Sequence, residues 1–239
     1  MINFEKVDVW GFEHAIRGMR NPMNSWERSD SYPAVDCGKC GIVEREGFCN
    51  PKEHDCSQFE TYEIGQNDYD LMARLIKGGS EHRKFLRQIF VSVDITAPLY
   101  WWKEFDTYKV GTTANSQSTM HKIHSKPIEL SDFSIDDFEI NNEGIYLEDC
   151  FINVIADCEM LRQRYMETKD KRYWRGLVQL LPDSYNQKRT LTMSYENLLN
   201  MLKQRKAHKL DEWREFCDWI FTLPNSHILR ERVSENESS

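Results

Sequence analysis

The spacing of apolar residues along the chain predicts which segments fold as helices and which fold as strands. Apolar residues three, four and seven positions apart mark the buried face of a helix, and strict alternation marks a half-buried strand. The helical spacing predicts helices at 12–20, 67–77, 98–105, 151–165, 173–181, 194–202 and 210–220. Alternating, β-branched residues predict a strand at 89–95, and a shorter strand is expected at 2–8.

Several predicted helices carry residues that cap or stop a helix. Asn67 or Asp68 is suited to cap the helix that follows, and the glycine pair that begins at Gly78 ends it. Ser194 is suited to cap a helix near the C-terminus. By contrast, residues 21–66 are rich in Asn, Ser, Asp, Gly, Pro and Cys, which predicts a long irregular segment.

These elements place the chain in the α+β class, with a strand–helix core and a mostly helical C-terminal half. We expect one domain over 1–232, because chains of this length form a single core before they divide. The polar residues 233–239 are expected to be a disordered tail.

Charge and hydropathy then narrow the classes of partner. The 239 residues include 31 Lys and Arg against 39 Asp and Glu, which gives a formal net charge of −8. Such a chain does not match a phosphate backbone, so sequence-independent binding to nucleic acid is not expected. No apolar run approaches the roughly 20 residues of a membrane span, and the N-terminus lacks the pattern of an export signal. We therefore expect no membrane association and a cytoplasmic location.

The cysteines between positions 37 and 56 form a candidate metal site. Cys37 and Cys40 belong to a C-x-x-C-G turn, and Cys49 and Cys56 follow with His54 between them. In a reducing compartment, closely spaced cysteines indicate metal before disulfide, and zinc takes four such ligands. The sequence predicts a zinc site formed by Cys37, Cys40, Cys49 and either Cys56 or His54. The alternative is a loop of reduced, unpaired thiols, because the second pair is spaced more widely than a standard zinc knuckle.

The remaining cysteines and the longest aromatic run are expected in the core. Cys150, Cys158 and Cys217 lie on apolar helix faces and are predicted to pack there rather than to act as nucleophiles. The run Tyr100-Trp101-Trp102 has helical spacing, so we assign it to the core rather than to a ligand-stacking site.

Segments in the first half of the chain carry a family resemblance. Residues 15–20 read Ala-Ile-Arg-Gly-Met-Arg, similar to an early A-x-R-A-A-R helix. The family has a glycine turn, a strand and an aromatic helix that lead to the signature R-H-R-x(n)-S-x-N-x-x-S-x-R. Matching elements here are residues 75–82, the predicted strand at 89–95 and the predicted helix at 98–105. Within 107–120, Asn115 and Ser118 keep the mutual spacing of that signature. These features resemble the flavin-dependent thymidylate synthases.

The C-terminal part resembles the same family more closely. Residues 180–182 and 194–205 match its pattern L-P…N-x-R-x-L-x-N-x-L-x-x-R. Asn200 and Arg205 occupy ligand-contacting positions of that pattern, and residues 210–215 resemble the A-Q-W-E-I-R that follows. The resemblance covers about 12–20, 67–120 and 173–222, and the cysteine-containing segment at about 30–62 looks like an insertion.

The resemblance implies a reaction and an assembly. In that family a reduced flavin (FAD) and methylene-tetrahydrofolate convert dUMP to dTMP, and the cofactors carry the chemistry while the protein orients them. The family is a homotetramer whose sites combine residues from several subunits. The resemblance therefore implies a nucleotide methyltransferase that binds FAD, folate and dUMP or a related pyrimidine nucleotide, as a homotetramer in the cytoplasm.

The resemblance also implies roles for individual residues. Arg205 would bind the pyrimidine edge and stabilise negative charge on the ring, and so act as the catalytic residue. Ser118 would donate to the nucleotide phosphate. Lys109, which stands for the third residue of R-H-R, would contact the cofactor together with Asn115 and Asn200. Five residues along a helix turn by about 140°, so Asn200 and Arg205 would touch two ligands packed side by side.

Departures from the family pattern support a second interpretation. Five family residues are replaced, and the substitutes are Thr107, Tyr108, Met120, Ser194 and Glu196. Each lost charge-assisted hydrogen bond is worth ~1.5–3 kcal/mol, so flavin binding would need compensation from basic residues such as Arg83, Lys84, Arg87 or Lys122. The alternative to methylation is a non-catalytic protein on the same scaffold that binds a nucleotide or a partner.

Overall fold

The computed structural model describes residues 2–36, 60–138, 141–142 and 145–232. The chain forms two compact units, and each is described by itself. The first unit comprises Met1–Val7, Ser92–Thr192 and His208–Phe216. The second unit comprises Asp8–Val91, Met193–Ala207 and Cys217–Ser239. The tail 233–239 lies outside the described residues, and the expectation of one domain over 1–232 stays a prediction.

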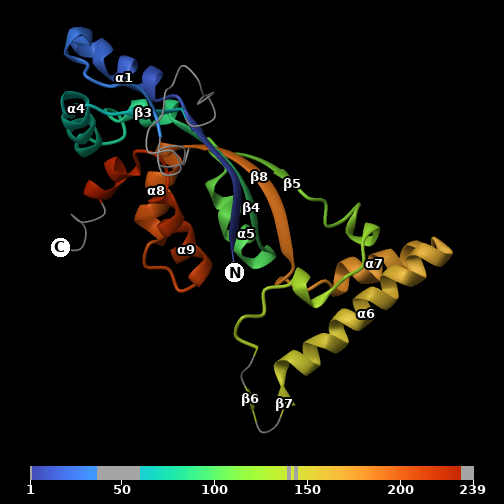
Figure 1. Cartoon of the computed structure of the whole chain (residues 1–239). Coiled ribbons are helices and arrows are strands. Elements are labelled where there is room, and N and C mark those ends of the chain that lie inside the picture. The colour runs from blue at the N-terminus through green and yellow to red at the C-terminus, as the bar shows by residue number, and fades with distance from the viewer. Residues whose placement is uncertain (1, 37–59, 139–140, 143–144, 233–239) are drawn as a thin grey trace, which may run out of the picture. The chain divides into compact units, whose positions relative to one another are not determined.

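A four-stranded sheet combines strands from distant parts of the sequence (Figure 1). Its strand order is β1-β4-β8-β5, with bounds Asn3–Trp10, Phe90–Pro98, Asn186–Ser194 and Thr113–Ser116. The strands expected at 2–8 and 89–95 correspond to β1 and β4. In β4, Val91, Val93 and Ile95 are fully buried, because alternate side chains of a strand point to the same face.

Sequence patterns did not predict β8, although it lies between two other strands of the sheet. Leu191 and Met193 continue an alternating pattern and are fully buried. The first half of the strand is polar, from Gln187 to Arg189, and conceals that alternation. Its backbone is nevertheless used, since the Gln187 carbonyl accepts a hydrogen bond from the indole of Trp102 at 2.9 Å.

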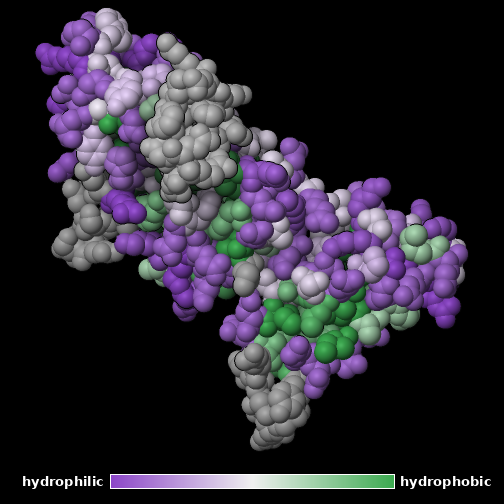
Figure 2. Space-filling view, viewed as in Figure 1, coloured by the Kyte–Doolittle hydropathy of each residue, from purple (hydrophilic) through white to green (hydrophobic). Residues whose placement is uncertain are grey.

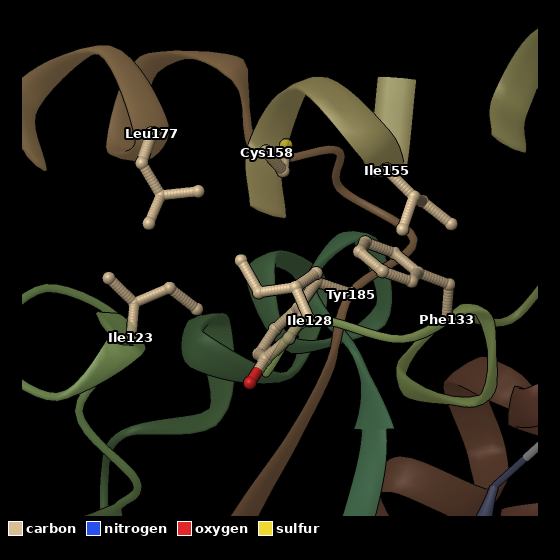
Figure 3. Packing of buried hydrophobic residues seen from close by; sticks show 7 residues of the cluster. All are labelled: Ile123, Ile128, Phe133, Ile155, Cys158, Leu177 and Tyr185. Atoms are coloured by element: carbon tan, nitrogen blue, oxygen red, sulfur yellow. The ribbon is translucent and has the colours of Figure 1, made fainter. Parts of the chain in front are cut away.

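Two helices and the chain on either side of them form a hydrophobic cluster in the first unit. Helix α6 (Leu147–Thr168) packs beside α7 (Lys171–Leu180), as Figure 1 shows. The buried side chains of the cluster (Figure 3) are Ile123, Ile128, Phe133, Ile155, Cys158, Leu177 and Tyr185. The helices expected at 151–165 and 173–181 are confirmed, and α6 extends further at both ends.

Cysteine positions agree with expectation in two cases of three. Cys158 and Cys217 are buried, but Cys150 is exposed. The prediction of a core position for Cys150 is therefore wrong. The reason is that the whole first turn of α6, from Leu147 to Cys150, is exposed and makes no part of the cluster.

Aromatic side chains build a second packed region of the first unit. Trp101 and Trp102 of α5 (Leu99–Phe105) are fully buried. The ring of Trp101 lies 4.9 Å from that of Trp213 and 5.6 Å from that of Phe216, centroid to centroid, on α9 (Asp211–Ile220). The assignment of these tryptophans to the core is confirmed.

The second unit contains α1 (Phe12–Arg20), α4 (Gln66–Lys77) and α8 (Tyr195–Arg205). Part of the segment expected to be irregular forms a small antiparallel ladder, in which β2 (Tyr32–Val35) pairs with β3 (Glu60–Glu63). The other short elements of the chain are η1 (Asn21–Met23), η2 (Trp26–Arg28), η4 (Lys84–Gln88), η5 (Asp106–Tyr108), η6 (Ile123–Ser125), η7 (Leu130–Asp132), η8 (Ser226–Arg232), β6 (Asn141–Asn142) and β7 (Ile145–Tyr146). Within the described residues, every helix is too short or too polar to cross a membrane.

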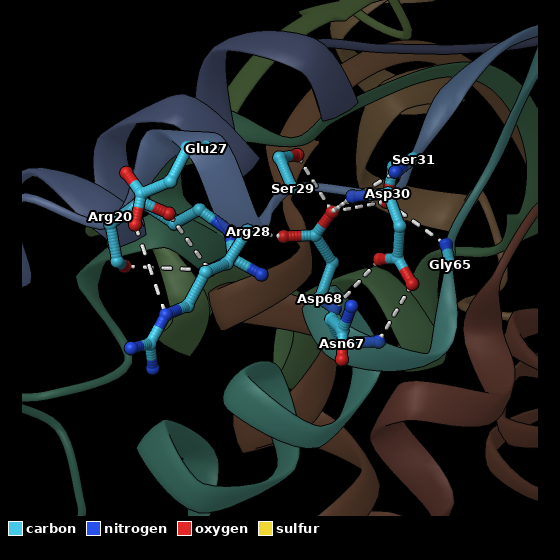
Figure 4. A network of polar contacts seen from close by, with 10 residues as sticks. Arg20, Glu27, Arg28, Ser29, Asp30, Ser31, Gly65, Asn67 and Asp68 are labelled. Atoms are coloured by element: carbon cyan, nitrogen blue, oxygen red, sulfur yellow. Dashed lines mark hydrogen bonds and ion pairs between the residues drawn. The ribbon is translucent and has the colours of Figure 1, made fainter.

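The start of α4 differs from the expected capping by Asn67 or Asp68. The helix begins at Gln66, and the carboxylate of Asp30 accepts the N–H groups of Asn67 and Asp68 at 3.0 and 3.2 Å. The Asp68 carboxylate is fully buried and instead pairs with Arg20 (Figure 4). A residue from a distant loop therefore caps the helix, which a local pattern does not reveal.

Candidate functional site

Helix α8 carries two of the predicted ligand-contacting residues. Ser194 caps the helix as expected, because its Oγ accepts the Asn197 N–H at 3.3 Å and the Asn197 side chain accepts the Ser194 N–H at 3.1 Å. Apolar residues such as Leu198 are fully buried and hold the helix in place. Asn200 and Arg205 are half-buried, in the middle and in the last turn of α8.

A buried ion pair lies at the start of α8. The Nε and Nη2 atoms of Arg83 donate to the two carboxylate oxygens of Glu196 at 2.9–3.1 Å. Arg83 Nη2 also donates to Asn200 Oδ1 at 3.1 Å. Arg83 and Glu196 are 5% and 7% exposed, and the bidentate contact fixes the plane of the guanidinium. Glu196 stands where the family pattern has an arginine, and the Arg83 guanidinium neutralises its charge.

The sequence identified Arg83 only as one of several basic residues, and the structure places it beside Glu196 and Asn200. It is the residue before η4, and its partner on α8 is 113 positions further along the chain. Lys84 instead pairs with a glutamate three positions earlier on the surface, and Arg87 donates to a nearby backbone carbonyl. Lys122 belongs to the first unit. The basic stretch was the available signal, but selecting Arg83 from it required the fold.

Tyr195, the first residue of α8, has a structural role. Its side chain is fully buried, and its hydroxyl donates to the carbonyl oxygen of Pro224. Burial raises the pKa of Tyr195 far above its usual value, so the phenol stays neutral. It anchors α8 and is not a candidate for proton transfer.

The other predicted ligand residues lie in the first unit, around β5. Lys109 follows the turn η5 and is exposed. Asn115 is exposed on β5, which pairs with β8. Ser118 is half-buried, and its Oγ accepts the His121 N–H at 2.9 Å, so its hydroxyl hydrogen can still be donated to a ligand.

The two groups of residues suit an anionic, oxygen-rich ligand. In the α8 group, the Arg83 guanidinium contacts the Asn200 amide and Arg205 lies in the last turn of the same helix, and guanidiniums bind carboxylate and phosphate through their planar fork. The β5 group presents an ammonium, an amide and a hydroxyl. Because the groups belong to different units, each is described separately.

The predicted zinc ligands lie outside the described residues. Cys37, Cys40, Cys49 and Cys56, and the alternative ligand His54, all fall within 37–59. Among the residues that the structure does describe, there is no group of three or more His, Cys, Asp or Glu side chains that could hold a metal ion. The zinc site therefore stays a prediction.

Comparisons of sequence identify no relative of this chain. No family model matches it. No curated protein matches it either.

Comparison of structures finds similar proteins over nearly the whole chain. Thymidylate synthase X from Helicobacter pylori with FAD and dUMP has a TM-score of 0.60 and 15% identity, covering 98% of this chain and 99% of that one. A second structure of the H. pylori enzyme, also complexed with FAD and dUMP, has the same TM-score and identity and covers 95% and 99%. A UMP/dUMP methylase, PolB from Streptomyces cacaoi bound with 5-Br dUMP, has a TM-score of 0.56 and 13% identity, covering 96% and 94%. The chain therefore has the fold of the flavin-dependent thymidylate synthases, which confirms the mixed helix and sheet architecture expected from the sequence.

Proposed function

We propose that this protein methylates dUMP, or a related pyrimidine nucleotide, to dTMP or its analogue in a flavin-dependent reaction with methylene-tetrahydrofolate as the methyl donor. The observation that carries the proposal is the α8 group. In it, Asn200 and Arg205 keep the family positions, and Arg83 supplies a guanidinium beside Glu196. The similarity in fold to proteins bound to dUMP and FAD supports the same ligand class.

Arg205 and Ser118 are the proposed substrate contacts. The Arg205 guanidinium binds the pyrimidine edge and stabilises negative charge that develops on the ring. The Ser118 hydroxyl accepts a backbone N–H and donates its own hydrogen to the nucleotide phosphate. In this proposal the residues orient the nucleotide and manage its charge, and none of them forms a covalent bond to it.

The residues of α8 fit the anionic part of a flavin. Glu196 alone would repel it, but Arg83 neutralises that carboxylate and stands beside Asn200. We assign Asn200, with Lys109 and Asn115 of the β5 group, to FAD binding. When bound, the flavin supplies the reducing electrons of the methylation.

The proposal includes a homotetramer in the cytoplasm. The α8 and β5 groups would then combine between subunits, as the family resemblance implies. Figure 2 shows hydrophobic residues gathered over α6 on a face that is otherwise mostly hydrophilic, which supports self-association. A zinc ion held by Cys37, Cys40, Cys49 and either Cys56 or His54 would stabilise the segment that contains them.

Titration calorimetry with dUMP tests the proposal. We expect the wild type to bind dUMP and Arg205→Ala to lose ~2–4 kcal/mol of binding free energy, because one charged donor leaves a desolvated site. Lys203→Ala is the control, since it removes an exposed cation from the same helix. Equal affinity of the Arg205→Ala protein and the wild type would refute the assignment of Arg205.

A non-catalytic nucleotide- or partner-binding protein is the second candidate. Its support comes from the replaced signature, where the Thr107 hydroxyl donates to a backbone carbonyl and Tyr108 packs against the Trp213 ring. Neither side chain is a cation that could contact a phosphate. Visible absorbance of flavin in the purified or FAD-reconstituted protein separates the candidates, because a colourless protein that binds dUMP favours the second.

A further inference from the structure

Arg83, Glu196 and Asn200 form one connected polar group in the second unit. Glu196 and Asn200 are four positions apart on α8, so their side chains lie on the same face of the helix. Arg83 precedes η4, which packs against α8. Its Nη2 atom donates both to Glu196 Oε1 at 3.0 Å and to Asn200 Oδ1 at 3.1 Å, so one nitrogen joins the two side chains of the helix.

The contact with Arg83 determines which way the Asn200 amide is turned. A guanidinium donates hydrogen bonds and accepts none, so the amide atom 3.1 Å from Arg83 Nη2 has to be the oxygen. The other end of the amide, Nδ2, therefore carries the two amide hydrogens and points away from Arg83. Turning the amide by half a rotation would set donor against donor, which leaves both groups without that hydrogen bond.

Glu196 holds Arg83 in the required orientation. Its two carboxylate oxygens accept from Arg83 Nε and Nη2 at 2.9–3.1 Å, and the two side chains are 6% and 9% exposed. A bidentate pair of this kind fixes the plane of the guanidinium. The plane in turn fixes the direction in which Nη2 meets Asn200, so the amide orientation depends on both members of the ion pair.

The Nδ2 atom of Asn200 is available to a ligand. It has no acceptor among the described residues, although Oδ1 of the same amide is used. Asn200 is half-buried, and Nδ2 does not belong to the unpartnered atoms that the fold encloses completely. An amide nitrogen in this state can donate to an acceptor atom of a bound molecule and cannot accept from it.

Hydrogen-bond polarity, rather than charge, decides what this group binds. The Arg83 charge is balanced by Glu196 at 2.9 Å, so the ion pair adds no net charge beside Asn200. A ligand acceptor opposite Nδ2 gains a hydrogen bond. A ligand donor at the same place would lose its hydrogen bond to water and find no acceptor, which is unfavourable.

We propose that Arg83 is a positioning residue, which turns the Asn200 amide so that its two N–H groups face the ligand. The α8 group then selects an acceptor atom, such as a carbonyl or phosphate oxygen, and rejects a donor. This inference rests on the proposed function, in which Asn200 contacts FAD. It adds that Arg83 acts through Asn200 and not on the ligand itself.

Titration of the full chain with FAD, followed by flavin fluorescence, tests the orientation of Asn200. The double variant Glu196→Gln with Asn200→Asp moves the carboxylate along the helix, so the net charge is unchanged and Arg83 keeps an anionic partner. It leaves an oxygen toward Arg83 but deletes the two outward N–H groups, and we expect FAD to bind about tenfold more weakly. Lys203→Ala, which removes an exposed cation from the same helix, should bind as the wild type does. Wild-type affinity in the double variant would overturn the assigned orientation.

A double-mutant cycle tests whether Arg83 acts through Asn200. Arg83→Lys keeps a positive charge beside Glu196 but removes the planar fork that also reaches Asn200, so we expect FAD binding to weaken about tenfold. In the Asn200→Ala protein the same change should have no further effect. Additive losses would mean that Arg83 contacts the ligand itself or acts only on the fold, and would overturn its positioning role. If thermal unfolding shows that Arg83→Lys does not fold, Arg83→Gln combined with Glu196→Gln takes its place in the cycle.

Failure of this proposal and failure of the proposed function give different results. A wild type that binds no FAD would refute flavin binding and the positioning role together. A wild type that binds FAD, with wild-type affinity in the double variant or additive losses in the cycle, would leave flavin binding in place and refute only the role of Arg83 at Asn200.

Discussion

Among the described residues, the second unit contains two buried ion pairs. Arg20 pairs with Asp68, and Arg83 pairs with Glu196, and all four are less than a tenth exposed. Burying an ion is costly unless a partner and further hydrogen bonds compensate it. Both carboxylates have such a partner and further hydrogen bonds. Removing one partner is therefore expected to lower the free energy of unfolding by more than the intact pair contributes to it.

We expect Asp68→Asn to lower the free energy of unfolding by about 3–5 kcal/mol, because it leaves Arg20 buried without a counter-charge. Urea denaturation followed by circular dichroism measures the change. Asp70→Asn is the control, an exposed position on the same helix, where we expect a change within ~0.5 kcal/mol. Equal unfolding free energies for the two variants would show that the Asp68 network does not stabilise this unit.

The thiols of Cys150, Cys158 and Cys217 should differ in reactivity. Burial raises the pKa of Cys158 to about 11 and that of Cys217 to about 12, whereas Cys150 is exposed. The thiolate is the reactive form, so a maleimide at neutral pH should label Cys150 and spare the other two. Peptide mass spectrometry measures this, with urea-unfolded protein as the control in which all three react. Rapid native labelling of Cys158 or Cys217 would contradict the burial.

At the scale of elements, local patterns predicted most helices but missed β8 and the shorter strands β2, β3 and β5. Helix α8 was predictable because the cap at Ser194 and the apolar spacing agree at the same place. Strand β8 was not predictable, because its first half is polar and shows no alternation of apolar side chains. Pairing of its backbone with the neighbouring strands of the sheet makes it a strand. The α4 cap from Asp30 was missed for a similar reason, since its donors and acceptor are far apart in the sequence.

The candidate site was predictable only in part. Asn200 and Arg205 followed from a motif that lies within one helix, so their residue types and spacing were visible in the sequence. Arg83 pairs across 113 positions with Glu196, and no local spacing encodes that contact. The buried pair of Arg20 and Asp68 likewise joins residues far apart in the sequence, and its burial is visible only in the fold.

Glu159 ties α6 to the segment that precedes it. Its carboxylate accepts from the Arg162 guanidinium at 2.6 and 2.7 Å and from the Ile128 N–H at 3.0 Å. These hydrogen bonds, that of Arg162 first, outweigh burial and lower the pKa of Glu159 from 4.5 to about 2. Ionised Glu159 therefore stabilises the fold above pH 4.5, and that stability is lost as the pH falls toward 2.

Between pH 4.5 and about 2, we expect the free energy of unfolding to fall less steeply with decreasing pH in Glu159→Gln than in the wild type. Urea unfolding at several pH values between them measures the slopes. Glu167→Gln, an exposed change on the same helix, should keep the wild-type slope. A wild-type slope in Glu159→Gln would mean that the Arg162 contact is not made in solution.

At the scale of the whole molecule, the predicted zinc site would stabilise the chain between two paired strands. Val35 of β2 lies opposite Glu60 of β3, and the four cysteines fall between them in the sequence. We expect elemental analysis to give one zinc per chain and chelation to lower the melting temperature, because metal binding is coupled to folding. Cys37→Ser should contain no zinc. Freshly purified protein without zinc, and with these thiols freely titratable, would exclude the site.

The oligomeric state determines whether the α8 and β5 groups can combine into one site between subunits. Ile152, Met160 and Met166 on α6 are 46%, 46% and 42% exposed, and each Å² of apolar surface left in water costs ~25 cal/mol relative to burial. These exposed side chains favour self-association, and the family resemblance implies four copies, so we expect multi-angle light scattering to give a mass near four times the 28.4 kDa of the chain. Measurements over a range of concentrations distinguish a stable tetramer from weak association. A monomer at every concentration would refute a site shared between subunits, and the dUMP titration would then have to be explained by the α8 and β5 groups of one chain.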